Sequence, residues 1–371
     1  MRIVIATTSG FHLRHLAREL LALGRDVTYM TYLPKFRIRR DGIALASARS
    51  HFLRLQPWST AALFRHLPAL QMRAVEALLA RTDAAFARDL PPCDVFIGLS
   101  AMAVESARTA RRKYGAKVII ERGSRHVSSQ QALLSATGGG PLGATYVERE
   151  LAGYELADYI ALPSRHSVES FLERGFEPAR LFRNPYGVDF AAFSPTPRPA
   201  GPLRLLFVGA WSFRKGCDIL ERLLAANPDL ALTHVGSGGD VPLPALANFV
   251  SVGHRTHREL RDLMASHHIL LLPSREDGFG MVLIEALACG LPVVASAMTG
   301  APDLKALIAA GDAVKVVAPA DVEALASAVR DAAEFVGRQP PDRRILAEAD
   351  VANLSWGAYA RRYDAFLRRI V

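Results

Sequence analysis

The stretch ILLLPSREDGFGMVLIEALACGLPVVAS, residues 269–296, constrains the fold more than any other part of the chain. Its first four residues are apolar and end at Pro273, which predicts a buried strand of a parallel sheet. Residues 281–289 are good helix formers, and Gly290 and Pro292 stand where a helix would end. Residues 293–295 predict the next buried strand. The loop between strand and helix should therefore lie at the carboxyl edge of a sheet, where α/β folds bind anionic ligands.

Three carboxylates accompany this predicted loop and helix. Glu276 and Asp277 are adjacent in the loop, between the strand and two glycines, Gly278 and Gly280. Glu285 follows Asp277 by eight residues and falls inside the predicted helix. Backbone amides at a helix N-terminus bind anions, and carboxylates accept hydrogen bonds from hydroxyl groups. The stretch by itself is therefore suited to phosphate and carries carboxylates beside that position.

The rest of the chain predicts two domains of α/β type, which 371 residues are sufficient to build. Residues 2–6, 13–23 and 26–31 form a strand-helix-strand pattern, with Gly10 in the first turn. The G-x-G-x-x-G fingerprint is absent from that turn, which argues against a nicotinamide-dependent dehydrogenase. Four prolines mark residues 194–202 as a linker, and residues 203–208 begin a second series of strands.

Residues 269–296 resemble the acidic signature of the retaining family-4 glycosyltransferases of GT-B fold. In that family an acid, seven residues and a glutamate span a Gly-Phe-Gly loop, and here Asp277 and Glu285 hold the two acidic positions. The resemblance is strong over residues 184–303. It implies two Rossmann-like, doubly wound parallel-sheet domains with a cleft between them. Residues 1–185 would form the acceptor-side domain, completed by a terminal helix at about 354–371, and residues 186–353 the donor-binding domain.

The resemblance also implies roles for individual residues. Asp277, Glu285 and His126 would be the catalytic residues, with Glu285 also binding the ribose. The donor sugar would lie against Glu276, Asp277, Gly278 and Phe279. The donor diphosphate would be bound by Gly10, Arg214, Lys215, Gly280, Met281 and Val282. The first acid of the family is usually glutamate, so Glu276 stays an alternative to Asp277. Ala210 stands where the family has an arginine, and Arg214 is the candidate to replace it.

Simpler interpretations stay open for three of these residues. Gly10 could serve only to form its turn, and Lys215 could be a cation that merely flanks one. His126 could be a loop histidine without a catalytic function. Positive charge next to a buried diphosphate is nevertheless what phosphate recognition requires, because phosphate oxygens that lose water need charge-assisted hydrogen bonds.

The function implied by the resemblance is transfer of a sugar, with retention, from a nucleotide-diphosphate sugar to an acceptor hydroxyl. UDP- or GDP-sugars are the expected donors, and a glycan, a lipid-linked molecule or a small molecule the acceptor. No Asp-x-Asp motif follows a strand, so cations and the helix dipole are expected to replace a metal, and no cofactor is expected. Two alternatives are a catalytically silent GT-B relative that acts as a scaffold, and another GT-B enzyme such as a nucleotide-sugar epimerase.

Charge is distributed unevenly along the chain. Residues 1–186 contain 26 basic and 16 acidic side chains, whereas residues 187–371 contain 19 and 20. A basic half suits anionic lipid or an acidic substrate, although a solvated arginine-rich face explains it equally well. No known nucleic-acid-binding signature is present, so no nucleic-acid partner is expected.

The predicted helix at residues 69–90 could supply a peripheral membrane contact. It has Arg73, Arg81 and Arg88 on one side, and Trp58, Phe64 and Arg65 lie close by in the sequence. An ordinary surface helix that covers a core is the alternative. Three widely spaced cysteines, Cys93, Cys217 and Cys289, fit a reducing compartment, and no apolar run could span a bilayer. A cytoplasmic protein is therefore expected.

Overall fold

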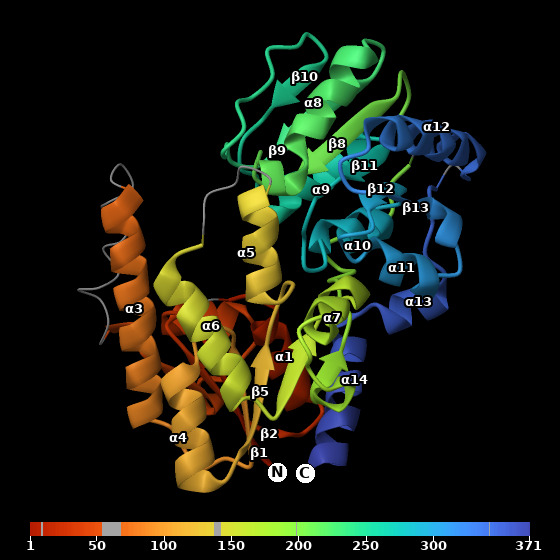
Figure 1. Ribbon diagram of the computed structural model, residues 1–371. Coiled ribbons are helices and arrows are strands. Elements are labelled where there is room, and N and C mark those ends of the chain that lie inside the picture. The colour runs from red at the N-terminus through yellow and green to blue at the C-terminus, as the bar shows by residue number, and fades with distance from the viewer. Residues whose placement is uncertain (9, 54–67, 137–141, 198, 341) are drawn as a thin grey trace.

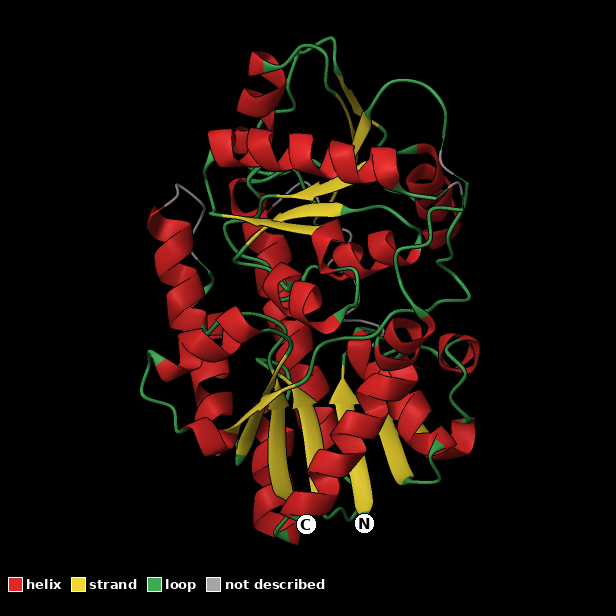
Figure 2. Cartoon of the chain, turned by 90° about the vertical axis from the view of Figure 1, so that its right-hand side faces the viewer, coloured by secondary structure: helices red, strands yellow, loops and turns green. Residues whose placement is uncertain are grey.

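The computed structural model describes residues 1–8, 10–53, 68–136, 142–197, 199–340 and 342–371 (Figure 1). Two parallel sheets lie one above the other, each flanked by helices (Figure 2). The central strands of both sheets are short, buried and largely apolar, as expected of parallel sheets that are covered on both faces. The predicted α/β fold with two doubly wound sheets is confirmed.

The first sheet has seven parallel strands in the order β3-β2-β1-β4-β5-β6-β7. Their bounds are β1 Arg2–Thr7, β2 Asp26–Thr31, β3 Ala48–Ser50, β4 Val95–Leu99, β5 Lys117–Glu121, β6 Tyr159–Leu162 and β7 Leu181–Arg183. Alternate residues of each strand point to opposite faces. Ile3 and Ile5 contribute to the core on one face, and Val4 and Ala6 to the core on the other.

The second sheet has six parallel strands in the order β10-β9-β8-β11-β12-β13. Their bounds are β8 Arg204–Val208, β9 Ala231–Val235, β10 Phe249–Ser251, β11 Ile269–Leu272, β12 Val293–Ser296 and β13 Val314–Val317. The stretch 269–296 forms β11, the helix α10 (Met281–Ala288) and β12, as predicted. All of β11 and β12 is buried at the centre of this sheet.

The remaining helices connect the strands and cover the sheets. Their bounds are α1 His12–Ala22, α2 Lys35–Arg40, α3 Pro68–Arg88, α4 Val104–Tyr114, α5 Val127–Ala136, α6 Ala144–Leu156, α7 Arg165–Leu172, α8 Cys217–Ala226, α9 His257–Ser266, α11 Ala301–Leu307, α12 Val322–Arg338, α13 Glu348–Asn353 and α14 Trp356–Ile370. Short 3₁₀ turns occur at Leu45–Ser47, Pro178–Arg180, Phe213–Lys215 and Gly311–Ala313.

Helix α3 is tied into the first half by its carboxyl-terminal part. Asp83 on α3 is fully buried and accepts hydrogen bonds from the backbone amides of Val104, Glu105 and Ser106, at 2.8–2.9 Å. It thereby caps the N-terminus of α4. Part of the membrane-contact prediction, residues Trp58, Phe64 and Arg65 and the side chain of Arg73, lies outside the described residues. Among the described helices, none is long and apolar enough to cross a bilayer.

The terminal helix α14 returns to the first sheet, so the N- and C-termini lie close together (Figure 1). Its Asp364 forms a two-point ion pair with Arg25, at 2.6 and 2.8 Å. Phe366 stacks on Phe182 with ring centroids 4.0 Å apart. Gly187, just beyond β7, passes so close to the start of α14 that an added Cβ would be 2.6 Å from the Trp356 amide nitrogen. The chain therefore crosses between the sheets twice at nearly the same place.

Arg343 is a structural element of the second half that the sequence pattern did not reveal. Its guanidinium is buried, with 1% of the residue exposed, and donates to carbonyl oxygens of Met264, His267 and Gly290. These carbonyls lie at the carboxyl ends of α9 and α10, where the last turn leaves acceptors without helical partners. One cation therefore joins two helix ends to the segment that leads toward α14.

We expect Arg343→Met to lower the free energy of unfolding by about 3 kcal/mol, because it leaves several buried carbonyls without a donor. Equilibrium denaturation in urea measures the change. Arg330→Met, at an exposed position on α12, is the matched control and should change stability by less than about 0.5 kcal/mol. Equal effects of the two substitutions would contradict the role assigned to Arg343.

Candidate functional site

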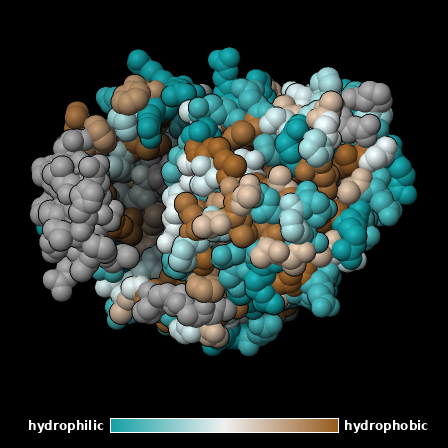
Figure 3. Space-filling view, turned by 90° about the horizontal axis from the view of Figure 1, so that it is seen from above, coloured by the Kyte–Doolittle hydropathy of each residue, from teal (hydrophilic) through white to brown (hydrophobic). Residues whose placement is uncertain are grey.

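A cleft of about 1390 Å³ lies between the two sheets. One wall includes Gly10, His12 and Arg122 from the first half, and the other includes Arg214, Asp277 and Glu285 from the second. In each sheet the strand order reverses between two neighbours, β1 with β4 and β8 with β11, and open α/β sheets bind ligands where the order reverses. Figure 3 views the molecule from above and shows a hollow toward the left of that view.

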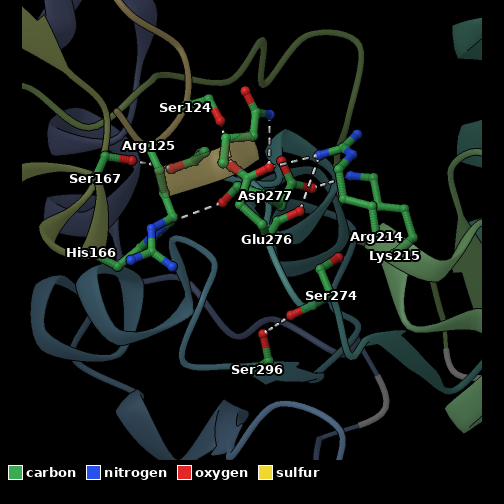
Figure 4. A network of polar contacts seen from close by, with 12 residues as sticks. Ser124, Arg125, His166, Ser167, Arg214, Lys215, Ser274, Glu276, Asp277 and Ser296 are labelled. Carbon is green, nitrogen blue, oxygen red and sulfur yellow. Dashed lines mark hydrogen bonds and ion pairs between the residues drawn. The ribbon is translucent and has the colours of Figure 1, made fainter. Parts of the chain in front are cut away.

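Glu276, at the start of the loop after β11, joins the two halves of the molecule. Its carboxylate is fully buried and accepts hydrogen bonds from Ser124 Oγ and, at 3.1 Å, from Gln130 Nε2 of the first half. Arg214 of the second half donates to the same carboxylate at 3.3 Å and to the backbone oxygen of Glu276 at 3.0 Å. A buried carboxylate requires such donors, and here they come from both halves of the molecule (Figure 4).

Asp277 differs from Glu276 because its side chain faces the cleft. Lys215 Nζ, from the turn after β8, donates to Asp277 Oδ2. Burial by itself would raise the pKa of Asp277, but the charges of Lys215 and Arg214 outweigh it and hold that pKa below its usual value. The aspartate is thus ionised, and a cation is already beside it (Figure 4). The structure brings Asp277, Lys215 and Arg214 together from two separate stretches of the sequence.

Gly278 is the point of closest backbone approach between the halves. A Cβ at this position would be 1.7 Å from the carbonyl oxygen of Gly123, so no other residue fits without separating the two loops. The Gly278 carbonyl accepts a hydrogen bond of 2.5 Å from Ser164 Oγ, and His166 Nε2 donates to the Asp277 carbonyl at 3.0 Å. The acidic loop is therefore held against the carboxyl edge of the first sheet.

Helix α10 begins at the cleft, and the loop before it requires glycine. Gly280 has φ +71° and is the N-cap, and a Cβ there would also lie 2.6 Å from Leu272 Cδ2. Met281 and Glu285 line the cleft one turn apart, while Val282 is half-buried. Burial raises the pKa of Glu285 to about 7, and this side chain has no hydrogen-bond or ion-pair partner within the part of the chain that is described.

The turn after β1 brings Gly10 into the cleft together with His12, a residue that the sequence prediction did not single out. His12 Nε2 lies 2.9 Å from Glu121 Oε2 at the end of β5, and Tyr359 of α14 donates to the other oxygen of Glu121 at 3.2 Å. The sequence held a signal for this pair, because His12 follows β1 and Glu121 ends β5, and the carboxyl ends of these parallel strands lie at one edge of the sheet.

His126 and Phe279 do not reach the cleft. His126 is buried among the rings of Tyr154, Phe171 and Phe176, and burial lowers its pKa to about 4, with Arg174 and Arg122 contributing. Phe279 is 2% exposed and packs edge-on against Tyr186. The predicted placement of His126 with the carboxylates, and of Phe279 in the same site, is therefore not what the structure has, since neither residue lines the cleft. Their apolar surroundings explain why they are buried.

Several further groups line the cleft without having been predicted. Arginines form the largest set, and an aromatic and two polar residues accompany them: Arg14, Arg18, Arg37, Arg40, Arg122, Trp356, Ser124 and Gln130. Arg122 is buried and bound to Glu150 at 2.7 Å, so it is structural as well as cleft-lining. Among the described residues, no three histidine, cysteine or acidic side chains gather closely enough to hold a metal ion.

We expect Gly278→Ala to lower the free energy of unfolding by about 1–3 kcal/mol, because the methyl group overlaps the Gly123 carbonyl. Urea denaturation measures this loss. Gly337→Ala on α12 is the control, since a Cβ there meets nothing within 4 Å and alanine is the better helix former. A stability for Gly278→Ala as high as that of the control would show that the loops do not pack as described.

The chain is similar in sequence to known proteins, mainly in its second half. Residues 202–335 match the family model described as Glycosyl transferases group 1. The chain is 35% identical over 156 residues to D-inositol 3-phosphate glycosyltransferase 1 of Catenulispora acidiphila, covering 34% of this chain and 37% of that protein. It is 32% identical over 203 residues to glycogen synthase of Mycobacterium tuberculosis, covering 50% and 47%. The matches thus span less than half the length of these curated relatives.

Solved structures match over the whole chain. Sucrose-phosphate synthase from Thermosynechococcus elongatus aligns with a TM-score of 0.67 at 20% identity, covering 100% of this chain and 99% of that one. Anabaena HepE in complex with UDP and glucose aligns with a TM-score of 0.66 at 16% identity, with full coverage of both. The protein therefore has the GT-B fold of glycosyltransferases, and its second half contains the segment that matches glycosyl transferases group 1.

Proposed function

We propose that this protein is a retaining, metal-independent glycosyltransferase of family 4. It would move a sugar from a nucleotide-diphosphate sugar to a hydroxyl of a glycan, a lipid-linked molecule or a small molecule. One observation carries the proposal. Lys215 and Arg214 lie beside Asp277 near the N-terminus of helix α10, in the cleft between the two sheets of a GT-B fold. Support also comes from the match of residues 202–335 to a glycosyltransferase family model.

The cationic turn after β8 suits the leaving diphosphate. Charge builds up on that group as the bond to the sugar breaks, and preorganised cations in a partly dry site stabilise it. Lys215 is at present neutralised by Asp277, whereas Arg214 still has a third of its side chain exposed beside the cleft. Arriving phosphates would compete for Lys215 and release Asp277. The N-terminus of α10, with the amides near Met281, adds a fixed positive dipole.

The carboxylates would then divide their roles by position. The Glu276 side chain is engaged in contacts between the halves, so Asp277 is the acid we assign to the hydroxyls of the transferred sugar. Glu285, exposed to the cleft and without a partner among the described residues, is assigned to the ribose diol, where one carboxylate can accept two hydrogen bonds. UDP-sugars are the favoured donors, because HepE was solved in complex with UDP and glucose.

The proposal extends to partners and location. The basic first half suits an anionic glycan or lipid-linked acceptor, and a peripheral membrane contact through α3 is consistent with its exposed Val75 and Arg88. We expect the protein to be cytoplasmic, because Cys93, Cys217 and Cys289 are all free and buried. No cofactor apart from the donor is part of the mechanism.

The decisive experiment is a calorimetric titration with UDP-, GDP- and ADP-sugars, followed by assays of sugar transfer in EDTA with the donor that binds. We expect one donor class to bind and Lys215→Met to weaken it by roughly tenfold or more, because a charge-assisted contact to phosphate is lost. Lys305→Met, at an exposed position on α11, is the control.

The possible outcomes separate the alternatives. A scaffold would bind none of the donors, and an epimerase would convert the donor without transferring its sugar. Loss of activity in EDTA that Mg²⁺ or Mn²⁺ restores would refute metal independence while leaving the transferase assignment intact.

The raised pKa of Glu285 makes donor binding dependent on pH. The ionised carboxylate accepts hydrogen bonds from a diol on both oxygens and more strongly than the neutral acid, and ionisation occurs as pH rises through about 7. We therefore expect the affinity for UDP-glucose, whose diphosphate does not titrate in this range, to increase roughly five- to tenfold between pH 6 and pH 8. Glu285→Gln, which cannot ionise, should give a flat profile. A wild-type profile as flat as that of the variant would remove Glu285 from the donor site.

A further inference from the structure

Four arginines from two helices of the first half line the same cleft. Arg14 and Arg18 lie four residues apart on α1, and Arg37 and Arg40 three residues apart on α2, so each pair shares a helix face. Helix α1 contacts the turn directly after α2, since Arg14 pairs with Asp41 at 3.4 Å and the Arg18 stem would lie 3.0 Å from a Cβ at Gly42. The four side chains form one group, which we call the arginine cluster.

The protein itself neutralises the arginine cluster only in part. Arg18 pairs with its neighbour Glu19 at 2.7 Å, and the contact of Arg14 with Asp41 is long. Arg37 and Arg40 are exposed, and neither has an ion-pair or side-chain hydrogen-bond partner anywhere in the described ranges. Like charges gathered at the wall of a cleft repel one another unless an anion is bound between them.

His15 lies next to the arginine cluster, and Arg14 Nε donates to its Nε2 at 3.2 Å. Its ring stacks on Trp356 with centroids 4.2 Å apart, and both residues line the cleft. Burial lowers the pKa of His15 to about 3, and the charges of Arg14 and Arg18 contribute to the decrease. This histidine stays neutral, so the ring pair forms an apolar wall beside the guanidinium groups. A ligand here would meet cations and an aromatic surface together.

The donor's diphosphate already has cations on the opposite wall, Lys215 and Arg214 of the second half. The arginine cluster is built on helices of the first half and is therefore available to the other substrate. We propose that the acceptor of the sugar carries a phosphate group and that Arg14, Arg18, Arg37 and Arg40 bind it. This inference rests on the proposed function, and it names the chemical class of the acceptor. Guanidinium groups suit it because they bind phosphate oxygens in two-point contacts.

The first test is binding of inorganic phosphate to the protein saturated with UDP, measured by calorimetry, since UDP occupies the donor's phosphate site. We expect wild type to bind phosphate and the R37Q/R40Q double variant to bind it at least tenfold more weakly. The matched control is K35Q/R39Q, which removes two exposed charges from the same helix at positions that do not line the cleft. Its phosphate affinity should stay within twofold of wild type.

A second arm identifies the source of the phosphate. Inositol monophosphate is compared with inositol as a soluble pair, and phosphatidylinositol vesicles with phosphatidylcholine vesicles as a lipid pair. Preference for the anionic member of either pair, inositol monophosphate over inositol or phosphatidylinositol over the zwitterionic phosphatidylcholine, supports the proposal and tells which source is used, provided that it is lost in R37Q/R40Q and kept in K35Q/R39Q. Absence of phosphate binding by wild type, or equal loss in the two double variants, overturns it.

The two levels of the proposal fail in different ways. If the protein binds UDP but does not bind phosphate through the arginine cluster, the proposed function stands and the proposal of a phosphorylated acceptor is wrong. If the protein binds no nucleotide sugar but binds phosphate through Arg37 and Arg40, the transferase assignment is wrong. The arginine cluster is then an anion-binding site of another function. Measurement of UDP affinity in both double variants completes the comparison, and it should stay within twofold of wild type.

Discussion

The relation between the two halves depends on a buried carboxylate. Taking a charged group out of water costs several kcal/mol, so a glutamate at the interior of a junction persists only where donors surround it. Glu276 meets this condition with Ser124 and Gln130 from one half and Arg214 from the other. Removing any of these donors leaves the charge less compensated. The carboxylate thereby holds the loop after β11 against the first sheet, in the position from which the site is built.

Neighbouring contacts strengthen the same junction. The Gly278 carbonyl accepts a hydrogen bond from Ser164 Oγ. The carboxylate of Asp303 in α11 accepts one from the backbone amide of Arg165, at the start of α7. Each contact pairs a group after a strand of one sheet with a group after a strand of the other. This follows from the topology, because parallel strands collect their carboxyl ends, and the loops that follow them, along one edge. Two such edges that face each other produce a cleft with polar groups on both walls.

Asp277 shows how the junction shapes the chemistry. It follows the anchored Glu276 directly, so its backbone is fixed while its side chain is directed to Lys215 and the cleft. The two adjacent acids therefore differ in what they contact. The Glu276 carboxylate holds the two halves together, whereas the Asp277 carboxylate faces the cleft and can exchange Lys215 for another partner. The opposite wall carries the arginine cluster, so a ligand in the cleft lies between cations of two different origins.

Much of this was predictable from local patterns. Short apolar runs that end at proline or glycine predicted the strands, and the stretch 269–296 predicted β11, α10 and β12 with their glycines. The site was predictable in part, because Asp277, Glu285 and Arg214 all follow strands and do line the cleft. His126 also follows a strand, but the ring contacts that bury it come from α6, α7 and the segment beyond α7, and no local pattern reveals these.

The sequence by itself determined the two parallel sheets, the acidic loop and the cationic turn, since hydrophobic periodicity and turn residues act over a few neighbouring positions. Only the tertiary structure decided which acid is anchored, that Arg343 joins two helix ends, and that α1 and α2 bring four arginines to one wall. These features depend on contacts between residues far apart in the chain. Packing of whole elements creates such contacts, and the energy of each depends on burial that no single segment determines.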